Sequence, residues 1–208
     1  LENRARMVIE IVRGIRKEVP GLGIAVRLSA FDSIPHEPNP DTAVDGKLGQ
    51  GRPKMYEHLL PYQWGFGINP ERPTEVDLSE PHRFIEWLSN EGVELLNVTG
   101  GSPYYTPHML RPAAFPPSDG YQPHEDPLLS VAKHFQVTRQ IKQRHPRMLV
   151  VGSGYSYLQE HLAASAVHNV RAGWTDFVGL GRTILSYPKI LTDAVLRGSS
   201  ERKLICRT

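Results

Sequence analysis

Four short apolar segments, each followed by a helical pattern, set the strongest limit on what this chain can fold into. They are residues 23–29, 94–98, 148–151 and 176–178, and helices are predicted at about 3–18, 81–90, 127–144, 158–170 and around 182–197. Apolar, β-branched strands that alternate with helices are typical of a parallel sheet buried on both faces. We therefore predict an α/β fold of about four parallel strand–helix units. Two long loops, 32–80 and 99–125, are rich in proline and glycine and lack periodicity.

The first helix is predicted from apolar residues at helical spacing. Met7, Val8, Ile11, Val12 and Ile15 fall on one face of residues 3–18, and we expect that face to be buried.

Glycines and an arginine follow the last two predicted strands. Gly152-Ser153-Gly154 comes after the third strand, and Gly179-Leu180-Gly181-Arg182 after the fourth. In βα proteins ligands bind beyond the carboxyl ends of the strands. Glycines let a backbone turn sharply and approach a ligand, N–H groups at the start of a helix attract anions, and an arginine adds a charged contact. Together the two stretches predict one phosphate-binding cup, although glycines at strand ends more often serve only as turn residues.

Arg27 lies inside the first apolar strand, in Ala25-Val26-Arg27-Leu28-Ser29. Burying an unpaired charge is costly. Arg27 is therefore expected either to point into solvent at the strand end or to meet an anion or a polar ligand there.

Composition excludes several classes of protein. The 208 residues are 39% hydrophobic and carry a formal net charge of +2, with lysine and arginine spread along the chain, so we expect no nucleic-acid partner. No apolar run is long enough for a bilayer, no leader pattern opens the chain, and Cys206 is the single cysteine. We expect a cytoplasmic protein without membrane contact, and one partial domain over residues 1–208, cut from a longer polypeptide.

Other candidate residues are weaker. Among the nine histidines there is no His-Glu-x-x-His pattern, and Asp126 of His124-Glu125-Asp126 is expected to cap a helix, so we expect no metal site. In the second long loop Tyr104, Tyr105, His108 and Arg111 either face a ligand or, in the favoured interpretation, the tyrosines pack the loop onto the protein.

Five segments in order resemble the C-terminal half of an Old Yellow Enzyme-type NADH:flavin oxidoreductase. The match begins with Leu1-Glu2-Asn3-Arg4, which resembles the segment after the fourth barrel strand. Segments 25–29, 96–100, 150–154 and 176–182 resemble the fifth to eighth strands. Gly101-Ser102-Pro103-Tyr104-Tyr105 and the stretch 116–121 resemble one bacterial branch of that family.

The resemblance implies a fold and a cofactor. Family members are FMN-containing TIM (β/α)8 barrels that pass a hydride from NAD(P)H through the flavin to an activated alkene, a quinone or a similar acceptor. The resemblance places Arg27 against the N1 and C2 carbonyl edge of the flavin. It implies that the FMN phosphate is held by Gly152, Ser153, Gly154, Gly181 and Arg182.

The chain also departs from the family. The residues that the family's first four strands supply, including those that grip and protonate the substrate, cannot be placed here. We therefore expect a half barrel that carries the FMN phosphate site, is inactive alone, and either self-associates through two open sheet edges or exposes an apolar face. Two alternatives stay open: a non-catalytic fragment that binds no flavin without the missing half, and another phosphate-binding barrel enzyme without flavin.

Overall fold

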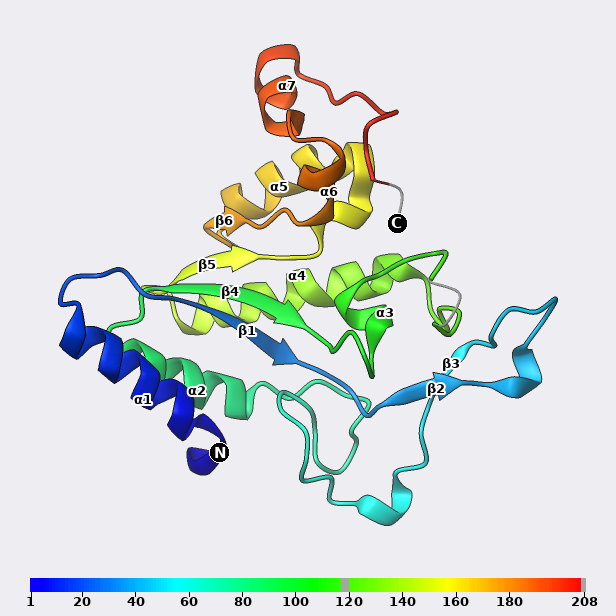
Figure 1. Cartoon of the computed structure of the whole chain (residues 1–208), viewed down its shortest axis with the longest axis horizontal. Helices are drawn as coiled ribbons and strands as arrows, with labels where there is room; N and C mark the ends of the chain where they lie inside the picture. The colour runs from blue at the N-terminus through cyan, green and yellow to red at the C-terminus, as the bar shows by residue number, and fades with distance from the viewer. Residues whose placement is uncertain (117–119, 207–208) are drawn as a thin grey trace.

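A four-stranded parallel sheet organises the protein (Figure 1), in a computed structural model that describes residues 1–116 and 120–206. Its strands are β1 (Ala25–Phe31), β4 (Leu95–Gly100), β5 (Leu149–Gly152) and β6 (Phe177–Val178), in the order β1-β4-β5-β6. Every neighbouring pair is parallel. The α/β class and the four parallel strands are thus as predicted, and β1 and β6 form the two edges of this sheet.

Three helices cover one face of the sheet: α1 (Glu2–Glu18), α2 (Ser79–Asn90) and α4 (Pro127–Arg144). Because strand side chains alternate between faces, every second residue points toward these helices. The resulting core is apolar and joins strands to helices; it includes Leu96, Val98, Val150, Val12, Ile85 and Ile141.

The other face of the sheet is largely open, which corrects the prediction of a sheet buried on both faces. On β1 the side chains of Ala25, Arg27 and Ser29 are exposed. Leu149 on β5 and Phe177 on β6 are 41% and 50% exposed. The apolar runs misled the prediction because they include residues of both faces, and only one face meets helices of the described chain.

Helix α1 buries a face that overlaps only in part with the predicted one: of the predicted residues Val12 is buried and Val8 and Ile15 are half-buried. Ala5, Ile9 and Val12 are buried, whereas Met7 is 68% and Ile11 53% exposed. The buried residues Ala5, Ile9 and Val12 follow one another at helical spacing, so the buried stripe is rotated away from Met7 and Ile11.

Both long loops contain short regular elements that were not predicted. Loop 32–80 holds an antiparallel hairpin of β2 (His36–Pro38) and β3 (Gly51–Pro53), with 3₁₀ turns η1 (Pro40–Thr42) and η2 (Glu57–Leu59). Loop 99–125 holds α3 (Pro107–Leu110). These elements depend on long-range hydrogen bonds, such as the 2.9 Å bond from the His36 N–H to the Tyr105 carbonyl, which local sequence does not reveal. Residues 117–119 of the stretch 116–121 lie outside the described residues.

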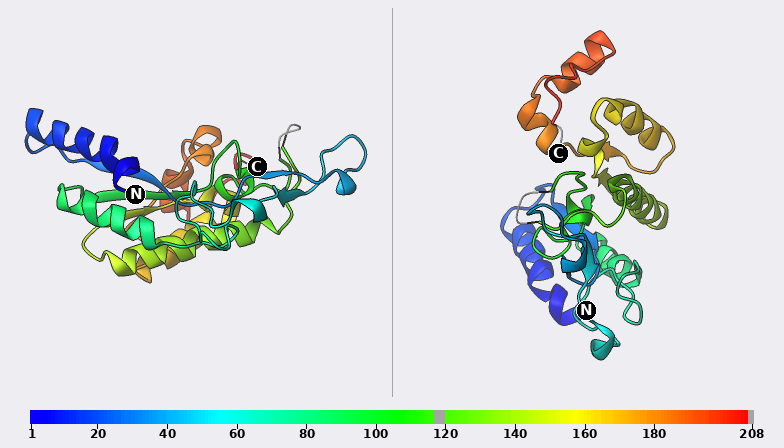
Figure 2. Two further views of the ribbon diagram at one scale, coloured as in Figure 1. Left: turned by 90° about the horizontal axis from the view of Figure 1, so that it is seen from below. Right: turned by 90° about the vertical axis from the view of Figure 1, so that its right-hand side faces the viewer.

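The C-terminal third follows β5 with η3 (Tyr155–His161) and α5 (Leu162–Arg171), and follows β6 with α6 (Arg182–Ser186) and α7 (Ile190–Arg197). Tyr187, Ile190 and Ile205 form a second, smaller core there. Figure 2 shows α7 at the β6 end of the molecule, far from α1. In the described part of the chain, no helix combines the length and the apolar character that crossing a membrane requires.

Candidate functional site

A pocket of about 390 Å³ opens at the carboxyl ends of the parallel strands. It brings together residues from all four strands or the turns that follow them. Five of the six predicted site residues line it: Arg27, Ser153, Gly154, Gly181 and Arg182.

The sixth predicted residue, Gly152, has a different place. It ends β5 and accepts a hydrogen bond of 2.8 Å from the backbone N–H of Gly179. A Cβ atom at this position would lie 3.3 Å from the Thr175 Oγ1 atom. Gly152 therefore gives room to Thr175, which precedes β6, and it is not part of the pocket lining.

Arg182 supplies the clearest electrostatic feature of the pocket. Its Nη1 atom is buried and has no hydrogen-bond partner in residues 1–116 and 120–206. Burial lowers the pKa of Arg182, and the nearby Arg111, which lines the same pocket, lowers it further. Two arginines that line one pocket, one of them with a buried N–H donor that has no partner among the described residues, favour an anionic ligand.

Arg27 is exposed on the open face of the sheet and lines the pocket. The expectation that it meets an anion or a polar ligand there stays a prediction. Its strand register places it beside Asn97 of β4. The Asn97 amide donates hydrogen bonds to the Val151 carbonyl at 3.1 Å and to Ser153 Oγ at 3.2 Å. A row of polar side chains thus crosses the sheet from Arg27 to Ser153.

Gly154 turns the chain at the pocket in a conformation that favours glycine. Its φ is +96°, and a Cβ atom there would lie 3.3 Å from the Cβ of His134. His134 donates from Nε2 to the Met109 carbonyl at 2.7 Å, which leaves its buried Nδ1 as an acceptor with no partner in the described chain. Burial lowers the pKa of His134, so the ring is neutral near pH 7.

Gly181 precedes α6, as predicted, but the helix contributes little. With five residues α6 has a weak dipole, so anion attraction must come chiefly from the arginines. A Cβ atom at Gly181 would meet no atom within 4 Å. The space above this glycine is therefore open to a ligand.

Several lining residues were missed from the sequence: Asn97, Thr99, His134, Ser156 and Tyr157. Alignment of the predicted strands would have found Asn97, since it pairs with Arg27. The sequence did not indicate His134, because this residue lies in the middle of a helix and is distant in sequence from every strand end.

In loop 99–125 the favoured prediction, that Tyr104 and Tyr105 pack the loop onto the protein, is wrong. Tyr104 and Tyr105 are 85% and 58% exposed, so they do not pack the loop onto the protein. Arg111 does line the pocket. His108 instead meets His36 and His124, a cluster that sequence spacing could not indicate because the three residues are far apart in the chain.

Comparison with known proteins gave no assignment: the chain matches no family model. A search of curated proteins also found no match.

Proposed function

We propose that this chain is the FMN phosphate-binding half of a TIM (β/α)8-barrel oxidoreductase that passes a hydride from NAD(P)H to an activated alkene, a quinone or a similar acceptor. Four parallel strands in sequence order, helices on one face and an open opposite face are consistent with one half of such a barrel. The resemblance of five segments to NADH:flavin oxidoreductases supplies the identity of the cofactor.

The observation that carries the proposal is the buried Nη1 atom of Arg182, which has no partner in the described residues and lies near Arg111. Barrels of this type often bind phosphate at the turns after the last two strands, and here those turns supply Ser153, Gly154 and Gly181 to the same pocket. A phosphate would accept a hydrogen bond from the unpaired N–H of Arg182, and its negative charge would offset the positive charges of Arg182 and Arg111. These residues therefore fit the phosphate end of FMN.

Arg27 gives the proposal its flavin component. It is a cation on the open sheet face, and Asn97 beside it adds an amide. FMN, when bound, supplies the hydride-carrying chemistry, and its reduced form bears negative charge near N1 and the C2 carbonyl. A fixed guanidinium near that edge would stabilise the charge. Because the family's substrate-gripping residues have no counterpart here, we expect this chain to bind FMN without turning over.

A phosphate-binding barrel enzyme without flavin is the second candidate. It accounts equally well for Arg182 and Arg111, but it gives no role to Arg27. The test must therefore separate recognition of the phosphate from recognition of the flavin ring.

FMN binding, followed as quenching of flavin fluorescence, is the test. We expect saturable binding that Arg182→Ala weakens by about 10- to 100-fold, since a charge-assisted hydrogen bond contributes roughly 1.5–3 kcal/mol. Riboflavin, which lacks the phosphate, should bind more weakly than FMN and should not respond to Arg182→Ala. Arg171→Ala, at an exposed arginine that ends α5 outside the pocket, is the matched control and should bind FMN like the unmodified chain.

Three outcomes would contradict the proposal in different ways. Equal binding of FMN and riboflavin would show that the pocket does not recognise the phosphate. Binding of inorganic phosphate without any binding of FMN would favour the barrel enzyme without flavin. Absence of all binding would favour the non-catalytic fragment.

A further inference from the structure

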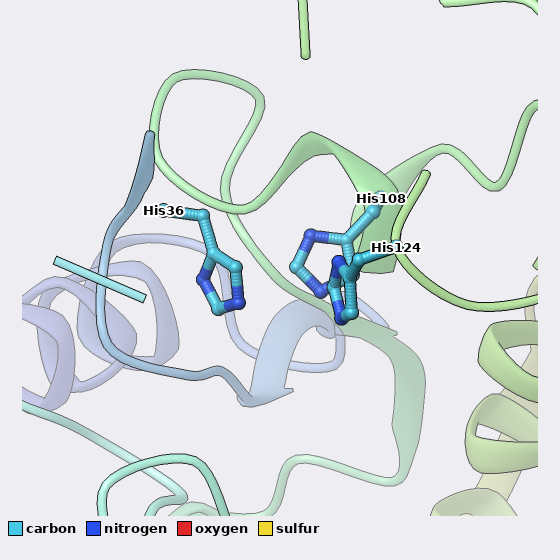
Figure 3. Close-up of side chains that lie close together, drawn as sticks. All are labelled: His36, His108 and His124. Carbon is cyan, nitrogen blue, oxygen red and sulfur yellow. The ribbon is translucent and has the colours of Figure 1, made fainter. Parts of the chain in front are cut away.

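Three histidines from three separate segments meet on the side of the protein that carries the hairpin. His36 belongs to β2, His108 to α3 and His124 to the segment before α4 (Figure 3). One nitrogen of each ring lies within 4.8 Å of a nitrogen of both others. The ring centroids are 4.7 Å apart for His36 and His108, and 4.6 Å apart for His108 and His124.

Two of these rings have an outer hydrogen-bond partner on Nδ1. His36 donates from Nδ1 to the Ile34 carbonyl at 2.8 Å, so its neutral ring carries a lone pair on Nε2. His108 Nδ1 lies 2.7 Å from the hydroxyl of Tyr121. Histidines that bind metals commonly use one nitrogen for the metal and donate from the other to a carbonyl or another oxygen. Both rings already have such an outer partner.

Imidazoles that bind a metal ion must be neutral, and the surroundings of these three rings disfavour the charged form. Burial lowers the pKa of His36 and of His124, and it lowers the pKa of His108 to about 3. Lys133 and the other two histidines also oppose a positive charge on His108. Lys133 forms an ion pair with Glu125. The Glu125 carboxylate accepts hydrogen bonds from Lys133 Nζ at 3.0 Å and from Ser130 Oγ at 2.9 Å.

The cluster is held together without an ion. The hairpin that carries His36 hydrogen-bonds to the segment that carries His124, through Gly51 N–H to the Gln122 carbonyl at 2.9 Å and Gln122 N–H to the Gly49 carbonyl at 2.9 Å. A Cβ atom at Gly51 would lie 2.5 Å from the Tyr121 ring, so this contact requires glycine. Because the segments that carry the histidines are already held in place, binding of an ion costs less conformational entropy.

We infer that His36, His108 and His124 form a binding site for a divalent transition-metal ion such as Zn²⁺, with the fourth coordination position open to solvent or to an exchangeable ligand. Imidazole nitrogens suit zinc, cobalt, nickel and copper. Three protein ligands with one open position are the pattern of exchangeable rather than purely structural zinc sites. His124 is the exposed member of the three, so the cluster is accessible from solvent on its side. This inference does not depend on the proposed flavin function.

Titration of the untagged protein with Co²⁺ and Zn²⁺ tests the site. We expect one equivalent of Co²⁺ to give the visible absorption of a low-symmetry site with nitrogen ligands, and Zn²⁺ to displace it. His124→Ala should weaken binding by more than the roughly 10–100-fold that loss of an outer partner costs. The exposed position of His124 keeps the risk of misfolding low. Zn²⁺ should also raise the melting temperature of the unmodified protein and not that of His124→Ala.

Two further variants complete the test. Tyr121→Phe should weaken the affinity by about 10–100-fold and keep the one-to-one stoichiometry, because it removes only the outer partner of His108. The control is His58→Ala, at an exposed histidine outside the cluster, in loop 32–80, which also carries His36. This variant should bind the metal like the unmodified protein. The inference is overturned if Co²⁺ gives no such spectrum, or if His124→Ala binds the metal as tightly as the unmodified protein.

Discussion

His82 and His145 share a single hydrogen bond, with His82 Nδ1 3.0 Å from His145 Nε2. One ring must donate and the other must accept, so at least one of them is neutral. Burial is the main cause that lowers the pKa of both rings, and Arg144 opposes their protonation while Glu86 favours it. In the unfolded chain both histidines titrate at their ordinary pKa and bind protons sooner as the pH falls.

Stability should therefore decrease as the pH falls from about 7 toward 5, because the unfolded state binds more protons than the folded state over this range. Melting curves measured across this range would show it. His145→Gln, which keeps a side chain that hydrogen-bonds but does not titrate, should make the profile less steep, while other histidines whose pKa burial lowers, such as His36 and His134, keep part of the slope. The control His58→Gln should leave it unchanged. An identical profile for the unmodified protein and His145→Gln would exclude the pair as a source of pH dependence.

At the residue scale, the sequence predicted those residues of the pocket that directly follow strand ends. Arg182, Ser153 and Gly154 were found because a buried strand fixes what comes after it. Arg111 was only one of several loop candidates, because its approach to Arg182 depends on how the loop folds back. The histidine cluster could not be predicted, since no short-range spacing connects His36 with His108.

At the scale of elements, α4 shows how far local signals reach. Its predicted bounds, 127–144, are those observed, because Asp126 and Pro127 together mark a helix start. The Asp126 carboxylate accepts a hydrogen bond of 2.9 Å from the Leu128 N–H, which confirms the predicted N-cap.

Asp126→Ala should lower the free energy of unfolding by about 1 kcal/mol, since this is the typical effect of losing an N-cap. Chemical denaturation would measure it. Asp126→Ser restores an oxygen acceptor and should recover most of the loss. If alanine and serine had equal effects, charge or some other contact, rather than capping, would account for the residue.

The hairpin β2–β3 and the buried face of α1 mark where local signals end. The hairpin has only three residues in each strand and depends on hydrogen bonds to a loop some 70 residues away. On α1 Ala5 and Ile9 are buried while Met7 and Ile11 are exposed, and the apolar pattern of the helix alone does not distinguish these two stripes.

For the whole molecule, the open sheet face is the dominant feature. It carries Leu149 and Phe177 in exposed positions, and both edge strands leave backbone groups without strand partners in the described chain. Parallel sheets are normally covered on both faces, so this surface favours association.

We expect the protein to form dimers or larger species as its concentration rises, as followed by light scattering during size-exclusion chromatography. Phe177→Glu should shift the equilibrium toward monomer and reduce binding of a hydrophobic dye. Met7→Glu, at an exposed apolar residue on α1 away from the open face, is the control and should change neither. A monomer at all concentrations that binds no dye would contradict this expectation.

Neighbouring strands of the sheet are paired over fewer and fewer residues from β1 to β6. β1 pairs with β4 over its length, β4 pairs with β5 only over residues 95–97, and β5 pairs with β6 only at Val151 and Gly152. Local opening therefore costs least at β6, and the backbone amides there should exchange with solvent sooner than those of β4. Because Gly181 and Arg182 follow β6 directly, the wall of the pocket that carries them belongs to the part of the sheet that opens first. The FMN that we propose for this pocket could then enter through local opening at β6, while the core between the sheet and α1, α2 and α4 stays folded.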